Sequence, residues 1–229
     1  MKFIFLLLIL SLLLFDAAAQ DNKKIEFQIG AGTNLSIPYK KQIVISIPFG
    51  NLPAKEYNSR FGYFAECLVT YNFNDRIGVN SGLNYSLNNI NEFVDFDDIS
   101  TDYNLRFSYF QIPVLLKYQL HNNLPLSVYV GPYFGFLVSA REKGKISGLF
   151  TWTLGDPVFE EIEVDNDIKE YYSNFDMGLS FRIDYSITLN EKLNGMVFTG
   201  FNMGLTNTIE NKSYEWRNYG LILGLGIKF

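Results

Sequence analysis

The sequence contains few residues that could do chemistry, and none of them forms an evident catalytic pair. His121 is the single histidine, and it lies beside Asn122 and Asn123 in a short polar segment typical of a turn. A hydroxyl nucleophile needs a base next to it, and no partner for His121 stands out. Cys67 is the single cysteine, so the chain forms neither an internal disulfide nor a cysteine-based zinc site. We therefore predict no enzymatic activity.

Two acidic stretches are the candidates for cation binding. Dense carboxylates can bind calcium, or hold lipopolysaccharide through bridging divalent ions. The stretches comprise Asp95, Asp97, Asp98 and Asp102, and then Glu160, Glu161, Glu163, Asp165 and Asp167. Both lack the glycine and terminal glutamate of an EF-hand loop. We predict solvated acidic loops without metal or cofactor, and Asp95, Asp97 and Asp98 are the candidate ligands if a metal binds.

The beginning of the chain has the composition of an export signal. Lys2 precedes an apolar run over 3–15, and Ala17-Ala18-Ala19 offers a cleavage site before Gln20. The run is shorter than the roughly 20 residues of a membrane-spanning helix. We predict a signal peptide at 1–19 and one mature domain at 20–229.

Composition limits the classes of protein to which the mature domain can belong. Of the 229 residues, 48% are hydrophobic and 17% aromatic, which is too apolar for a disordered chain. The formal net charge is -5, so the chain lacks the basic footprint of a nucleic-acid-binding protein. No later stretch reaches the length of a membrane helix, so a mature membrane protein would cross as strands.

From Glu26 onward, apolar and polar residues alternate with a period of two, as in strands with unlike faces. The clearest segment is 175–188. One face of this segment carries Phe175, Met177, Leu179, Phe181, Ile183, Tyr185 and Ile187. The other carries Asp176, Gly178, Ser180, Arg182, Asp184, Ser186 and Thr188. A helix cannot sort these residues in this way.

The same alternation predicts eight strands, joined by short turns and long loops in turn. The strands are expected at 25–35, 60–72, 76–87, 104–120, 126–139, 172–188, 195–206 and 217–229. The long loops are expected at 36–59, 88–103, 140–171 and 207–216. This is the layout of an eight-stranded antiparallel up-and-down transmembrane β-barrel, with long extracellular loops and short periplasmic turns. Both termini would then face the periplasm.

Alternation alone does not say which face points outward, since a soluble lipid-carrying barrel has its apolar face inside. The polar face is rich in small residues such as Gly78, Ser180 and Gly224, which suit a narrow lumen better than a water-exposed surface. Aromatic residues near strand ends suit the girdles of a membrane barrel. They are Tyr71, Tyr85, Tyr118, Tyr171, Tyr172, Trp216 and Tyr219. We therefore predict the apolar face toward lipid and Cys67 among the lipid-facing residues.

Charged residues on the predicted inner face form a second candidate site. They are Glu26, Glu66, Lys117, Arg182, Asp184 and Lys228. An isolated buried charge is costly, so we expect these residues to pair across the lumen. The long loop at 140–171 is a third candidate, because Phe150, Trp152 and Phe159 offer aromatic contacts. This loop either binds a partner or packs on itself to cap the barrel.

Several segments together resemble the PorT-like outer-membrane β-barrel family. Tyr109-Phe110-Gln111-Ile112-Pro113-Val114-Leu115-Leu116-Lys117-Tyr118 is similar to a strand of that family, and the segments 131–137, 175–179 and 220–229 are similar to later strands. The resemblance covers most of the mature chain and implies architecture and location. Members mostly lack an assigned activity, although PorT itself is associated with a protein secretion system.

These observations predict a non-enzymatic outer-membrane barrel that serves as a structural or accessory component of an envelope complex. Its expected surroundings are outer-membrane lipid and lipopolysaccharide, together with other envelope proteins. The alternative is a narrow conduit or a barrel that binds small solutes or ions through its lumen charges.

Overall fold

The computed structural model describes residues 24–42, 55–96, 99–121, 124–150, 158–190, 193–209 and 214–229. In these ranges the chain forms nine strands and one short 3₁₀ helix. The strands are β1 (Ile25–Gln42), β2 (Lys55–Asn72), β3 (Ile77–Phe96), β4 (Ile99–His121), β5 (Leu124–Phe150), β6 (Val158–Asp167), β7 (Phe175–Thr188), β8 (Asn194–Gly204) and β9 (Tyr214–Lys228). The helix, η1, spans Lys169–Tyr171. None of the described helical structure is long and apolar enough to cross a membrane. The predicted signal peptide lies outside the described residues.

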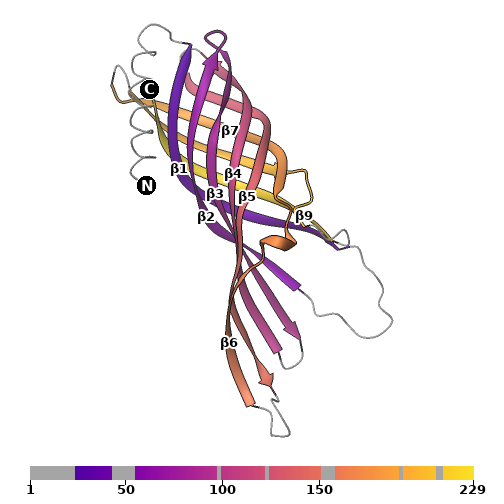
Figure 1. The fold of residues 1–229 in the computed structure, drawn as a ribbon. Helices are drawn as coiled ribbons and strands as arrows, with labels where there is room; N and C mark the ends of the chain where they lie inside the picture. Colours follow the sequence, from indigo (N-terminus) through magenta and orange to yellow (C-terminus); the bar gives the residue numbers. More distant parts are fainter. Residues whose placement is uncertain are drawn as a thin grey trace, which may run out of the picture.

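Eight of the strands close into a ring in the order β1-β2-β3-β4-β5-β7-β8-β9, and β9 returns to pair with β1 (Figure 1). All pairs are antiparallel, and each ring strand lies beside its predecessor. The residue Ile29 shows the closure, because it is opposite Cys67 of β2 on one side and Ile227 of β9 on the other. A closed sheet pairs its backbone groups without leaving edges. The predicted eight-stranded antiparallel up-and-down barrel is confirmed.

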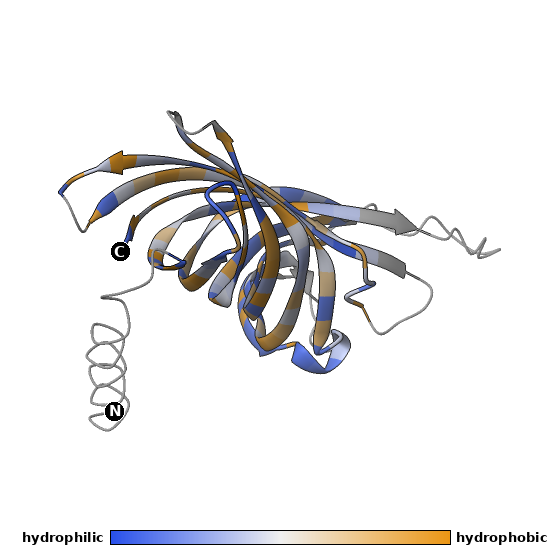
Figure 2. Cartoon of the chain, turned by 90° about the horizontal axis from the view of Figure 1, so that it is seen from above, coloured by the Kyte–Doolittle hydropathy of each residue, from blue (hydrophilic) through white to orange (hydrophobic). Residues whose placement is uncertain are grey.

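The wall of the barrel turns its apolar face outward. Along β7, Leu179 and Phe181 are exposed, whereas Ser180 and Arg182 between them are buried. Figure 2 shows the resulting alternation of hydrophobic and hydrophilic bands along the strands. The alternative of a soluble carrier with an apolar interior is therefore wrong.

Several strands continue past one end of the barrel as an open sheet (Figure 1). We call this the projecting sheet. It consists of 55–60 of β2, 89–96 of β3, 99–106 of β4, 141–150 of β5 and the whole of β6. The strand β6 lies outside the ring and pairs with β5 from Arg141↔Asp167 to Phe150↔Val158.

The projecting sheet corrects the expected loops, since much of 36–59, 88–103 and 140–171 is strand. The physical reason is that both faces of these segments carry polar residues. In β4, for example, Asp102 and Arg106 on one face alternate with Thr101 and Tyr103 on the other. A search for alternating hydrophobicity misses such strands.

At the opposite end, the described connections are tight. Residues 73–76 link β2 to β3, and the Asn74 side-chain oxygen accepts hydrogen bonds from the backbone N–H groups of Arg76 and Ile77, at 2.9 and 2.8 Å. This local bonding pattern is typical of an asparagine turn. We call this end the turn end; the C-terminal strand also finishes there (Figure 1).

Candidate functional site: a filled lumen and a charged projecting sheet

The charged residues of the predicted inner face lie together inside the half of the barrel near the turn end. They are Glu26, Glu66, Lys117, Arg182, Asp184 and Lys228, and we call them the lumen charge network. Three are cationic and three are anionic, so their formal charges cancel. Closely paired opposite charges lower the cost of removing each of them from water.

Arg182 is the centre of the network. Its Nε atom is 2.5 Å from Asp184 Oδ1, and its Nη1 atom is 2.6 Å from Glu66 Oε1. The guanidinium carbon also lies 3.7 Å from the centre of the Phe198 ring. The side chains of Arg182, Glu66 and Asp184 are at most 3% exposed. One guanidinium group therefore joins carboxylates from β2 and β7 and stacks on an aromatic ring of β8.

The two lysines complete the network. Lys228 Nζ lies 3.1 Å from Asp184 Oδ2 and donates a hydrogen bond to the Tyr129 hydroxyl at 3.2 Å. Lys117 Nζ lies 3.0 Å from Glu26 Oε1, and the neighbouring Asn72 oxygen accepts a further hydrogen bond at 3.1 Å. The alternation of the sequence does not identify Tyr129, Phe198 or Asn72 as members of this site.

Glycines opposite the large inner side chains make room for the network. A Cβ atom at Gly224 would lie 2.4 Å from Phe198 Cζ, whereas one at Gly220 would have only the Leu35 carbonyl oxygen nearby, at 3.7 Å. The small residues on the inner face of β9 thus accommodate the ring beneath Arg182.

We expect Gly224→Ala to lower the free energy of unfolding by about 1–3 kcal/mol, because the Phe198 ring, on which Arg182 stacks, must shift to make room for the methyl group. The matched control, Gly220→Ala on the same face of β9, should change it by less than about 0.5 kcal/mol. Urea unfolding of both variants in lipid vesicles measures the difference. Equal losses in the two variants would contradict the proposed tight packing at Gly224.

The middle of the lumen is polar and nearly full. Two cavities share Asn84, Gln111, Tyr133 and Asn202 in their linings, and in each about 30 Å³ is accessible to the centres of water molecules. That volume suits one or a few waters. Buried amide oxygens of Asn84 and Asn202 have no hydrogen-bond partner within the described residues. Ordered water molecules would satisfy these oxygen atoms.

Sequence reasoning also missed a buried carboxylate, Asp176, next to this polar middle. Its oxygens accept hydrogen bonds from Thr206 Oγ1 at 2.7 Å, Asn218 Nδ2 at 3.2 Å and the Tyr133 hydroxyl at 3.3 Å. The position of Asp176 on the inner face of 175–188 was the available signal. Its donors come from β5 and the region around β8 and β9, which are distant in the sequence.

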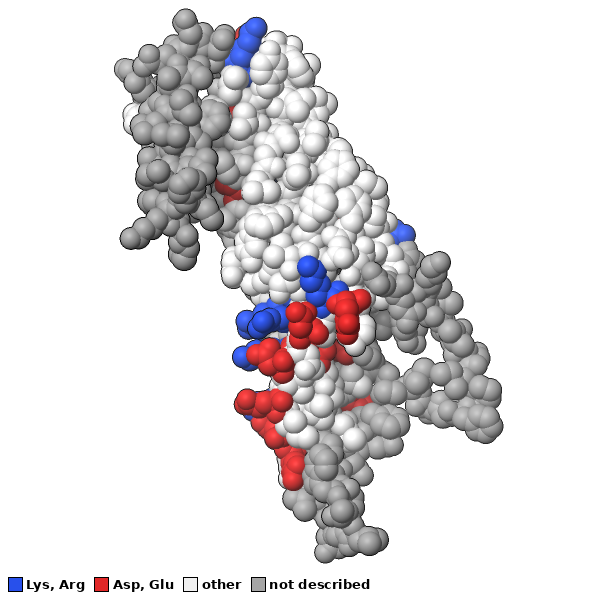
Figure 3. Space-filling model, in the orientation of Figure 1, with Lys and Arg blue, Asp and Glu red and all other residues white. Residues whose placement is uncertain are grey.

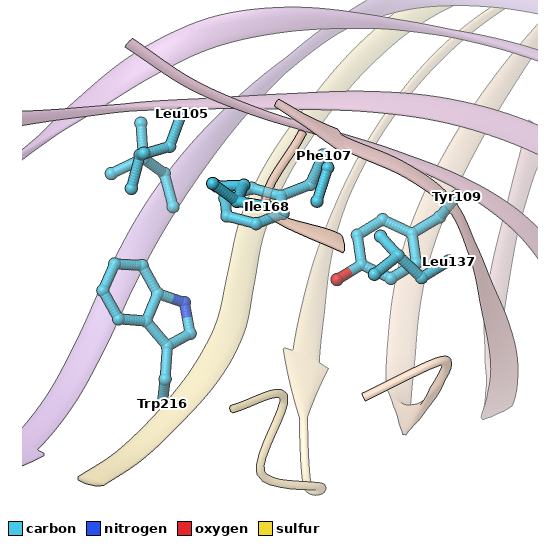
Figure 4. Packing of buried hydrophobic residues seen from close by; sticks show 8 residues of the cluster. Leu105, Phe107, Tyr109, Leu137, Ile168 and Trp216 are labelled. Atoms are coloured by element: carbon cyan, nitrogen blue, oxygen red, sulfur yellow. The ribbon is translucent and has the colours of Figure 1, made fainter. Parts of the chain in front are cut away.

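A cluster of buried hydrophobic residues lies where the projecting sheet leaves the barrel, and Figure 4 shows how its side chains gather between the strands. We call this cluster the plug. Its members are Ile90, Leu105, Phe107, Tyr109, Leu137, Ala140, Ile168 and Trp216. Trp216 also meets Tyr57 edge to face, with ring centres 4.7 Å apart. The expected place of Trp216 in an outer aromatic girdle is therefore wrong, because it shares the inward-facing register of Gly220 and Gly224.

The outer face of the projecting sheet carries charges in rows, which Figure 3 shows gathered beyond an almost uncharged wall. In the pairing of β5 with β6, Arg141 is opposite Asp167, Lys143 opposite Asp165, and Lys145 opposite Glu163. Lys143 forms an ion pair with Asp165 at 3.5 Å, and Lys145 forms a close one with Glu161.

The hydrogen bond and charge of Glu161 raise the pKa of Lys145, which stays cationic at neutral pH. The expected solvated loop is instead a hairpin of matched charges. The period of two in Arg141, Lys143 and Lys145, mirrored in the later acids, was the overlooked signal.

The remaining sequence-predicted residues are not brought into one site. Phe159 is 67% exposed near the start of β6 and pairs with Leu149, while Phe150 ends β5 opposite Val158. Trp152, Asp97 and Asp98 lie outside the described residues, and Asp95 is exposed in β3. His121 is the last residue of β4. The described part of the chain contains no group of three metal-ligating side chains.

The family model for the outer membrane protein beta-barrel domain matches residues 18–210. This chain belongs to that family. It is therefore an integral outer membrane protein, and the exposed apolar wall is the surface that contacts lipid. Cys67 is exposed on this wall, with Tyr63 and Val69 in the same strand.

Among solved structures, the chain is similar to neisserial surface protein A, with 13% identity and a TM-score of 0.41, over 89% of this chain and 95% of that one. It is similar to OprG from Pseudomonas aeruginosa, with 17% identity and a TM-score of 0.44, over 91% and 97%. Ail of Yersinia pestis, solved with a heparin analogue, has 14% identity and a TM-score of 0.39, over 90% and 99%. A comparison with curated proteins gives no match.

Proposed function

We propose that this outer membrane barrel is a non-enzymatic structural or accessory component of an envelope complex, and that it contacts its partner through the projecting sheet. In this proposal the sheet lies outside the cell, whereas the turn end and both termini face the periplasm. Outer-membrane lipid and lipopolysaccharide surround the wall. Short turns on the periplasmic side are the usual arrangement of bacterial barrels.

One contrast carries the proposal. The lumen is occupied along its length by the charge network, the polar middle and the plug, whereas the projecting sheet leaves a ladder of charged side chains exposed. A barrel whose interior is packed offers its outer surfaces for interaction. Binding residues also concentrate in exposed segments that a rigid scaffold positions, and the projecting sheet is such a segment.

The resemblance to PorT-like barrels supports a complex of the secretion or assembly type. The segment that carries it, 109–118, lies in β4, and its inner-face residue Lys117 belongs to the lumen charge network. The same β4 continues into the projecting sheet. The family-like strand and the proposed contact surface are thus parts of one continuous element.

The narrow conduit remains the second candidate, favoured by the two cavities that share lining residues beside Glu66 and Arg182. Passage of a solute would require the plug to open. Planar-bilayer recordings of the purified protein distinguish the two functions, because a structural barrel should give no conductance above background. Stable channels would favour the conduit.

Removing the hairpin tests the contact surface. Glu142 and Asn166 face each other in the β5–β6 register, so residues 143–165 can be replaced by an Asn-Gly turn that joins the two strands. We expect the shortened barrel to fold and to lose the partner that cross-links to the full chain in intact outer membranes. Recovery of the same partner by the shortened barrel would contradict the proposed surface, and a full chain that recovers none would contradict the proposed function.

A further inference from the structure

The strand β6 is an open edge of the projecting sheet. It is the last strand in the sheet order, and in the described ranges its ten residues pair with β5 alone. The N–H and C=O groups that point away from β5 therefore face no other strand of the described ranges. An exposed edge of this length is a template on which an extended segment can add by backbone hydrogen bonding.

The charges on β6 define what such a segment must carry. The outward row of β6 consists of Glu161, Glu163, Asp165 and Asp167. The row beside it on β5 is basic, and the outer face of β4 contributes Asp102 opposite Lys145. The basic row of β5 has a strand on both sides, β4 and β6. The acidic row of β6 has a described strand, β5, on one side only. Opposite charges on adjacent strands stabilise a sheet, so the next strand should present basic side chains.

The other face of β6 indicates which residue types the added strand should carry at its remaining, alternate positions. Ile162 and Val164 are half-buried there and alternate with the exposed acids. In the register with β5, Ile162 is opposite Ile146. A strand added to β6 would therefore place apolar residues beside Ile162 and Val164, and basic residues beside the acidic row.

We propose that β6 binds an extended segment of a partner protein, in which lysine or arginine alternates with apolar residues, by strand addition. The inference rests on the proposed function and specifies its partner. A second copy of this chain does not fit the edge, because antiparallel pairing of two β6 strands would bring two acidic rows together, and like charges directly opposite are destabilising.

A labelled peptide tests the proposal with the full chain in lipid nanodiscs. The probe is a ten-residue peptide in which lysine alternates with valine or threonine, and its binding is followed by fluorescence anisotropy. We expect saturable binding, and no binding by the same sequence N-methylated at every backbone nitrogen. Equal binding by the methylated peptide would overturn strand addition, because that peptide keeps the charges and loses the donors.

Paired variants test the role of the acidic row. Neutralising it with Glu161→Gln and Glu163→Gln should weaken peptide binding about threefold to tenfold, as expected for two cross-strand charge pairs. The control removes the same charge outside the projecting sheet, with Asp75→Asn in a turn and Glu170→Gln in η1, and should leave the affinity unchanged. Equal weakening in both double variants would overturn the assignment to β6.

Sedimentation and partner recovery separate the remaining outcomes. Sedimentation in detergent compares the wild-type chain with the Glu161→Gln, Glu163→Gln variant. If the wild-type chain dimerises and the variant dimerises more tightly, self-association replaces the proposal. If the envelope partner is lost with the hairpin but still binds the neutralised variant, the acidic edge is wrong and the proposed function stands. If the full chain recovers no partner while the peptide binds as expected, the proposed function fails and the edge specificity remains.

Discussion

Replacing Arg182 by methionine is expected to cost about 3–5 kcal/mol of the free energy of folding into a bilayer, because it leaves buried carboxylates without their shared cation. Glu66 and Asp184 both bond to Arg182, and their side chains are 2% and 0% exposed. Lys228 remains beside Asp184, so Glu66 is the group left uncompensated. Urea titration of the protein in lipid vesicles measures the loss.

A second substitution distinguishes lost charge pairing from lost packing. Adding Glu66→Gln to Arg182→Met makes the interior neutral again, so the double variant should recover a large part of the loss. If the double variant is no more stable than Arg182→Met alone, the contribution of Arg182 is its packing on Phe198 instead. A loss below about 1 kcal/mol for the single variant would show that water reaches the network.

Removing the indole of Trp216 is the second large effect. Trp216 is 2% exposed and belongs to the plug, together with residues of β4 and Ile168 (Figure 4). A buried tryptophan replaced by alanine typically costs about 3–5 kcal/mol, as lost transfer energy and a cavity. We expect Trp216→Ala to lower the stability by this amount in the same urea titration, and Trp216→Phe to lower it by less.

The plug also predicts a local consequence for the projecting sheet. Trp216 of β9 contacts Tyr57 of β2, and its cluster includes Ile168, which directly follows β6. In Trp216→Ala, trypsin should therefore cut at Lys143 and Lys145 faster than in the Arg182→Met variant, whose change lies in the other half of the lumen. Equal cutting rates would show that the sheet holds its position without the plug.

The architecture followed from the sequence to an unusual extent, because a membrane barrel repeats one physical constraint along its whole length. Lipid outside and a narrow lumen inside force opposite residue types onto alternate positions. The residue type at a position such as Leu179 or Ser180 therefore predicts whether its side chain faces lipid or the lumen. Each ring strand also pairs with the ring strand before it in the chain. The order of the strands can therefore be predicted from the sequence order, and the closing pair of β9 with β1 is the one long-range pairing in the ring.

The failures of prediction lie where that constraint ends. Beyond the bilayer both faces of a strand meet water or protein, so the segments at 88–103 and 140–171 lose their hydrophobic alternation although they remain strands. Trp216 was misplaced because its residue type suggests an interface. Its register, which it shares with Gly220, was the better guide.

By itself the sequence determined the eight-stranded ring, the outward apolar wall and the inward side of the charged residues, since each depends on a local period of two. Only the tertiary structure decided which charges meet, as in Arg182 with Glu66, which are 116 positions apart, and that the acids of β6 face the bases of β5. Pairing across a lumen or a sheet depends on strand register and barrel closure. These are properties of the whole ring, and no single segment contains them.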